Sequence, residues 1–199
     1  IITSRSGSAS YTYNLKLIDS SRSENVAVAS AHFFKTISAI VDLAKNDSEN
    51  VIAPFATDFQ SNIFKMVAYG TAKISVRYNT IADFERIDQR IRKTTALTRR
   101  LAQTVQSQLE GGLTRQPLPS SEASMELFES INRIAKRIDS SIVAEHRWSS
   151  SDICNISADV PKLDGFGPLG GFDKQKSEFI IRHSLVDRAL LLALLLQSK

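Results

Sequence analysis

The chain has 199 residues, 42% of them hydrophobic, which is enough apolar content to bury a substantial core. Its 25 basic and 21 acidic residues are mixed along the chain and leave a net charge of +4, so no nucleic-acid partner is predicted. The one cysteine, Cys154, excludes an internal disulfide and a multi-thiolate metal site, and the longest apolar run, residues 189–196, is too short to cross a bilayer.

The first part of the chain alternates between strand and helix patterns. Residues 1–10 are serine-rich and predict a linker or an initial strand, whereas residues 11–18 alternate apolar and polar side chains as a strand does. Residues 28–45 place apolar side chains at helical spacing and predict an amphipathic helix. Two further strands are predicted, over residues 50–59 and 63–78.

A second helix and a fourth strand complete this part. Thr80 and Asp83 form a capping pattern that begins the helix. A strand is then predicted over residues 104–110. The order strand–helix–strand–strand–helix–strand is that of a ferredoxin-like fold.

The remainder of the chain has α/β character. Residues 111–119 are rich in turn formers and mark a boundary. Ser121 is expected to cap a helix, and residues 141–148 to form a strand. The segment 161–171 is rich in glycine, which lets a backbone approach a ligand closely, so it predicts the wall of a site. Ser184 is expected to cap a final, leucine-rich helix.

Several short segments follow an order and spacing that one enzyme family shares. They are Asn62-Ile63, Val76-Arg77-Tyr78, residues 110–118, residues 149–155 and the glycine-rich segment 161–171. Together they resemble the co-catalytic zinc exopeptidases of the glutamate carboxypeptidase and aminoacylase type. In that family they correspond to an Asn-Val-Val-Pro segment, a Val-Arg-Tyr strand, a Glu-Gly-Gly-x-x-Arg motif, a glycine loop and a zinc-ligand loop.

The resemblance implies an α+β chain in two parts. Residues 1–112 would form a ferredoxin-like lid or dimerisation domain (βαββαβ), and residues 113–199 a partial α/β catalytic domain. The family's other half supplies a His-x-Asp motif, a Glu-Glu pair and a further carboxylate, none of which this sequence contains. A chain that opens at Ile1 without an initiator methionine is therefore expected to be a fragment.

The resemblance also implies the site residues. The family's zinc-binding histidine corresponds to Lys174, whose ammonium has no lone pair for a metal. No catalytic residue, metal ligand or cofactor is therefore expected in this chain, although zinc belongs to the parent family. Arg115 would bind a substrate carboxylate through its planar fork, or else be a solvated loop residue. The full set of expected substrate contacts is Arg115, Asn62, Ser149, Ser150, Gly170 and Gly171. Residues 149–151 also fit, and the pattern favours, a strand-to-helix turn with Ser151 or Asp152 as N-cap.

Two functions follow as hypotheses. In the first, the chain is the C-terminal portion of a zinc-dependent metallopeptidase or amidohydrolase. Such an enzyme is carboxypeptidase-like and removes a C-terminal residue or an N-acyl group from small amino-acid derivatives; this chain alone would be inactive. In the second, it is a degenerate, non-catalytic relative that serves as a dimerisation or ligand-binding module. The family resemblance and the exposed edge of the predicted sheet imply a homodimer through the lid. The short apolar runs predict no membrane partner, and the single cysteine suits a cytoplasmic location, with the periplasm left open.

Overall fold

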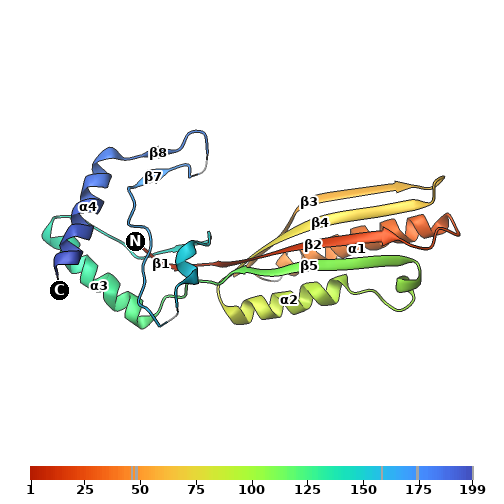
Figure 1. Cartoon of the computed structure of the whole chain (residues 1–199), viewed down its shortest axis with the longest axis horizontal. Coiled ribbons are helices and arrows are strands. Elements are labelled where there is room, and N and C mark those ends of the chain that lie inside the picture. The colour runs from red at the N-terminus through yellow and green to blue at the C-terminus, as the bar shows by residue number, and fades with distance from the viewer. Residues whose placement is uncertain (46, 48, 158, 174, 199) are drawn as a thin grey trace. The chain divides into compact units, whose positions relative to one another are not determined.

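The computed structural model describes residues 1–45, 47, 49–157, 159–173 and 175–198. The chain divides into two compact units (Figure 1). The sheet unit consists of Ser6–Pro117 and Trp148–Ser150, and the terminal unit of Ile1–Arg5, Leu118–Arg147 and Ser151–Lys199. The predicted domain boundary after residue 112 falls within a strand of the sheet unit.

The sheet unit is a four-stranded antiparallel sheet with two helices. Its strands lie in the order β3-β4-β2-β5, and each neighbouring pair is antiparallel. This order, with the chain sequence β2-α1-β3-β4-α2-β5, is ferredoxin-like and confirms the predicted α+β fold. The elements are β2 (Gly7–Leu17), α1 (Glu24–Lys45), β3 (Val51–Asn62), β4 (Val67–Tyr78), α2 (Ile81–Thr95), a short 3-10 helix (Leu101–Gln103) and β5 (Val105–Arg115).

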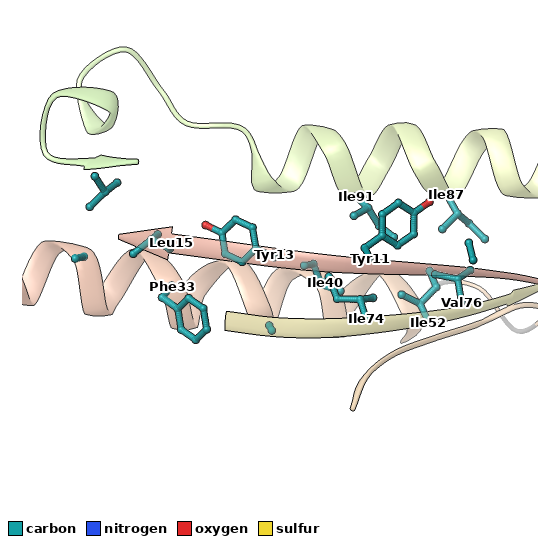
Figure 2. Close-up of a cluster of buried hydrophobic side chains, with 14 of the residues drawn as sticks. Tyr11, Tyr13, Leu15, Phe33, Ile40, Ile52, Ile74, Val76, Ile87 and Ile91 are labelled. Carbon is teal, nitrogen blue, oxygen red and sulfur yellow. The ribbon is translucent and has the colours of Figure 1, made fainter. Parts of the chain in front are cut away.

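The core of the sheet unit forms because side chains alternate along β2. Tyr11 and Tyr13 point to the face that the helices cover and are fully buried. Phe33 of α1 stacks on Tyr13, with ring centroids 6.0 Å apart, and on Phe59 of β3 at 5.0 Å. Gly70 leaves room for this stack, since a Cβ there would lie 2.6 Å from the Phe59 ring. Figure 2 shows Tyr11, Ile87 and Ile91 gathered between β2 and α2.

The helix caps follow the sequence closely. The Thr80 hydroxyl accepts a hydrogen bond from the Asp83 amide at 3.1 Å and caps α2, as predicted. Helix α1 begins at Glu24, earlier than the predicted residue 28. Among the helices that the described residues form, α1 alone is long and apolar enough to cross a membrane by length and composition. Its buried residues, Phe33 included, pack on the sheet instead.

The terminal unit is built around a short two-stranded parallel sheet. Phe128, Ile131 and Leu191 form its core. Its elements are β1 (Ile2–Arg5), which pairs with β6 (Glu145–Arg147), α3 (Glu122–Arg137), a 3-10 helix (Asp152–Asn155), β7 (Gly170–Gly171), β8 (Phe179–Ile180) and α4 (Arg182–Gln197). The Arg5 and Leu118 backbones exchange two hydrogen bonds of 2.9 Å, so the chain leaves this unit and returns to it at one place. Ser121 caps α3 as predicted, accepting from the Ser124 amide.

Three sequence predictions need correction. The strand expected over residues 141–148 is limited to β6, and β4 begins only at Val67 because a turn occupies the residues before it. Ser184 does not cap α4, which begins at Arg182. The Ser184 hydroxyl instead donates to the Ile181 carbonyl at 2.6 Å and accepts from the Leu169 amide at 2.8 Å. It therefore anchors the preceding loop to the first turn of the helix.

Candidate functional site

The last residues of β5 have an unusual backbone. Gly111 has φ +102° and Gly112 φ +149°, values that side-chain-bearing residues rarely adopt. A Cβ on Gly111 would lie 2.1 Å from the Ser10 carbonyl oxygen of β2. Ser8 then pairs with Arg115 while its neighbour Ala9 pairs with Leu113, so Thr114 forms a bulge. The extra residue changes the alternation of faces along β5, so Arg115 lies on the same face of the sheet as Ser8.

The bulge places two arginines beside one serine. Ser8 is the register partner of Arg115 on β5 and of Arg77 on β4. Side chains directly opposite one another share a face of the sheet, which here is the polar face away from Tyr11. The Tyr78 hydroxyl donates to the Arg115 carbonyl oxygen at 2.7 Å and fixes the backbone of this strand end.

A second serine reaches the same point. The Ser150 and Ser8 hydroxyl oxygens are 3.4 Å apart, and Ser8 is buried although it lies on the polar face. Ser149 is exposed in the same short segment, Trp148–Ser150, which belongs to the sheet unit. The structure therefore brings the predicted residues Arg115 and Ser150 together around Ser8.

Arg77 was not among the predicted contact residues. It is half-buried, and among the described residues no hydrogen bond or ion pair involves its side chain. A half-buried guanidinium without a carboxylate partner favours an anion from outside the unit. The signal in the sequence was the alternation of β4, which puts Arg77 on the polar face, but the pairing with Ser8 depends on a register that the sequence does not give.

Asn62 lies at the opposite end of the sheet. It ends β3, and its side-chain oxygen accepts from the Lys65 amide at 2.9 Å in the turn before β4. The turn lies just beyond the position where Tyr69 of β4 pairs with Lys16 of β2, whereas Arg115 pairs with Ser8 of β2. At about 3.4 Å per residue, Lys16 and Ser8 are roughly 27 Å apart along β2. Within one chain, Asn62 and Arg115 do not form one site.

The glycine-rich segment belongs to the terminal unit. Gly170 and Gly171 form β7 and pair with β8, and a Cβ on Gly170 would meet the Phe179 carbonyl oxygen at 2.1 Å. Asp164 pairs with Arg5 at 2.9 Å and accepts from the Gly165 amide. Burial opposes ionisation, but the Gly165 amide and Arg5 outweigh it and lower the pKa of the Asp164 carboxyl. The segment is thus tied to β1.

The donor set does not fit a metal. Lys174, at the position of the family's zinc ligand, lies outside the described residues. Across the described ranges, no group of three or more His, Cys, Asp or Glu side chains lies together. A catalytic zinc needs about three protein ligands, and the described residues bring no such set together.

His32 on α1 is part of the packing. Its Nε2 atom is buried without a hydrogen-bond partner among the described residues. Burial and the nearby Lys35 lower the pKa of the imidazole. His146 instead shares a 2.9 Å hydrogen bond with Ser4 in the terminal unit.

Acid should therefore destabilise the sheet unit through His32. Its pKa is lowered on folding, so the unfolded chain takes up the proton first as the pH falls below about 6.5. We expect the free energy of unfolding to be constant above that pH and to decline below it. Urea titrations from pH 7.5 to 5 should show a flatter decline in His32→Gln. The exposed control His183→Gln should follow the wild type; equal slopes for the wild type and His32→Gln would contradict this assignment.

Comparisons with known proteins give a fold. No family model and no curated protein sequence matches the chain. The structure is similar to aminopeptidase PepT from Bacillus cereus, with a TM-score of 0.77, 14% identity, and coverage of 96% of this chain and 52% of that one. It is also similar to the Bacillus subtilis YXEP protein, a dinuclear metal-binding peptidase from the M20 family, with a TM-score of 0.64, 12% identity, and coverage of 95% of this chain and 49% of that one. A third similar structure is an amidase of the hydantoinase/carbamoylase family from Burkholderia multivorans, with a TM-score of 0.64, 13% identity, and coverage of 96% of this chain and 47% of that one.

The chain spans about half the length of the structures it matches. At these identities the likeness concerns the fold. That fold is the mixed α+β arrangement of peptidases and amidohydrolases that include an M20-family member.

Proposed function

We propose that the chain is the C-terminal portion of a peptidase or amidohydrolase of this fold, and that the sheet unit binds the carboxylate of its substrate. The observation that carries the proposal is the row in which Arg77 and Arg115 flank Ser8, joined by the Ser150 hydroxyl. The fold supports the enzyme class, because the similar structures include a peptidase and an amidase.

The chemistry of this row suits a carboxylate. A guanidinium presents a planar fork of N–H donors that matches two carboxylate oxygens, and charge-assisted bonds of this kind are the stronger ones. Two guanidiniums and two hydroxyl groups provide donors to one anion. The substrate would be a small peptide with a free C-terminus or an N-acyl amino acid, held by its carboxylate while the acyl or peptide bond is cleaved elsewhere.

The catalytic metal would come from outside the described residues. Zinc is the metal we propose for the whole enzyme, with ligands and general base supplied by a part that this sequence does not contain. This chain alone would then bind a substrate carboxylate without hydrolysing the substrate. A cytoplasmic location fits the single, buried Cys154, which forms no disulfide.

The test is binding of N-acetylalanine to the chain, followed by the arginine Nε–Hε signals in nitrogen-15 NMR spectra. We expect saturable shifts of two arginine signals and no shifts with N-acetylalaninamide, which lacks the carboxylate. Arg77→Gln and Arg115→Gln should each weaken binding by about tenfold or more, the effect of losing roughly 1.5–3 kcal/mol of charged hydrogen bonding.

Arg99→Gln is the matched control, because Arg99 is exposed in the same unit and its loss removes the same charge. It should bind N-acetylalanine as the wild type does. Equal binding of acid and amide, or unchanged affinity in both Arg77→Gln and Arg115→Gln, would rule out the carboxylate site.

The second candidate function is a non-catalytic dimerisation module. Strand β3 is an edge strand, whose unpaired backbone groups invite pairing with another strand. Helix α1 packs beside it and exposes two apolar residues on one stripe, Phe34 at 54% and Val41 at 38%. An edge strand and an apolar helix stripe together favour a second copy of the same surface.

We therefore expect a homodimer through α1 and β3. Light scattering should give twice the chain mass and hold it on dilution. Phe34→Glu combined with Val41→Glu should yield monomers, because two carboxylates would be buried at the interface. The control Val28→Glu changes an exposed residue of α1 that lies off this stripe, and should leave the dimer intact. A monomeric wild type, or a dimer indifferent to the double change, would exclude this interface.

A further inference from the structure

A chain of polar contacts joins α2 to the glycine pair of β5. The Tyr11 hydroxyl donates to Asp88 Oδ1 at 2.9 Å. Arg92 Nε donates to Asp88 Oδ2 at 2.8 Å, and Arg92 Nη2 donates to the Gly111 carbonyl oxygen at 3.4 Å. Asp88 and Arg92 thus link the helix both to strand β2, through Tyr11, and to strand β5, through Gly111.

The contacts converge on one register position. Tyr11 and Gly111 are direct partners across β2 and β5. The series of hydrogen bonds from the Tyr11 hydroxyl through Asp88 and Arg92 to the Gly111 carbonyl therefore forms a closed ring with this strand pair. Burial and the hydrogen bond to Asp88 raise the pKa of the Tyr11 hydroxyl, as expected for a phenol held beside a carboxylate. The ring fixes β5 where its glycines leave the backbone most freedom.

An isolated Asp88–Arg92 pair would matter little. Arg92 is half exposed, and surface ion pairs at this helical spacing contribute little to stability. What distinguishes this pair is that Arg92 uses both ends of its guanidinium, one for Asp88 and one for a strand carbonyl. A helix surface pair needs only the first.

We propose that Asp88 and Arg92 are positioning residues for the carboxylate site. They hold β5 at Gly111, and the bulge beyond it then presents Arg115 beside Ser8 and Arg77. The proposal rests on the proposed function for its ligand, but its structural part concerns the backbone of residues 111–115 and can be measured without any ligand.

The experiment compares Arg92→Gln and Arg92→Lys with Lys93→Gln, an exposed position on the same helix that loses the same charge as Arg92→Gln. Amide hydrogen exchange should rise by about tenfold or more at residues 112–115 in Arg92→Gln and stay unchanged elsewhere in the sheet. Arg92→Lys should not rescue it, since one ammonium nitrogen cannot take the places of both Nε and Nη2. Lys93→Gln should match the wild type.

Binding of N-acetylalanine gives a second readout. Arg92→Gln should weaken it by about fivefold, and adding Arg92→Gln to Arg115→Gln should cost nothing more, because a positioning residue acts through the group it positions. Unchanged exchange at residues 112–115, full rescue by lysine, or additive losses of affinity would overturn the proposal. If the wild type binds no carboxylate, the proposed function fails. The exchange data alone then decide whether Asp88 and Arg92 hold β5 in place at Gly111.

Discussion

Alanine at Phe33 is expected to lower the free energy of unfolding of the sheet unit by about 3–5 kcal/mol, the usual cost of emptying an aromatic position in a core. The Phe33 ring is fully buried and stacks on both Tyr13 and Phe59, so its loss leaves a cavity between helix and sheet. Urea unfolding should be followed through the amide signals of β2 and β4, which report on this unit alone.

Phe34→Ala is the control, since it removes the same ring one residue along the helix. Phe34 is about half exposed, and its ring centroid lies 5.1 Å from that of Phe59. Loss of the Phe34 ring should therefore cost about 0.5–1.5 kcal/mol. Similar losses in the two variants would mean that the packing of α1 on the sheet differs from that described.

Alanine at Gly111 should be as damaging, for a backbone reason. Its φ of +102° strains any L side chain, and the new Cβ would meet the Ser10 carbonyl oxygen at 2.1 Å. The clash is with backbone, so β2 and β5 would have to separate there. We expect a loss of about 3–5 kcal/mol in urea unfolding, in the range of severe single substitutions, and loss of N-acetylalanine binding.

Substitutions at two other glycines distinguish the cost of backbone strain from the cost of a steric clash. Gly112→Ala keeps an unfavourable φ but meets only the end of the Arg92 side chain at 3.8 Å, so it should cost about 1–3 kcal/mol, the strain alone. A Cβ on Gly167 would meet nothing within 4 Å, and Gly167→Ala should be nearly neutral. If Gly111→Ala were no worse than Gly112→Ala, the close approach of β2 and β5 would be refuted.

Local patterns predicted most of the fold of the sheet unit. The alternation around Tyr11 and Tyr13, and the cap at Thr80, depend on neighbours in sequence, so they could be recognised without the structure. The first residue of β4 could not be recognised, because Met66 adopts φ +51° in the preceding turn, where the sequence has no glycine to indicate a turn. Ser184 has the composition of a cap, but a hydrogen bond from the distant Leu169 gives it another role.

The candidate site was only partly predictable, because it depends on register. The sequence identified Arg115 and Ser150 through a family pattern, and it contained Arg77 in another. That both arginines flank Ser8 follows from the β2–β4 and β2–β5 pairings and from the bulge at Thr114, which are long-range features. The same registers separate Asn62 from this group, although the pattern treats all of them as one set.

The hydrogen-bonded pair of Arg5 and Leu118 has a consequence for the chain path. Residues 6–117, which with Trp148–Ser150 make up the sheet unit, are inserted into the terminal unit between Arg5 and Leu118, and these two residues form an isolated antiparallel β-bridge. A turn of a few residues could join Arg5 to Leu118 directly, and the entropy of closing so short a loop is small. Replacement of residues 6–117 by another module would therefore leave the chain path of the terminal unit unchanged, and within the sheet unit it would leave only Trp148–Ser150 without the sheet that they contact.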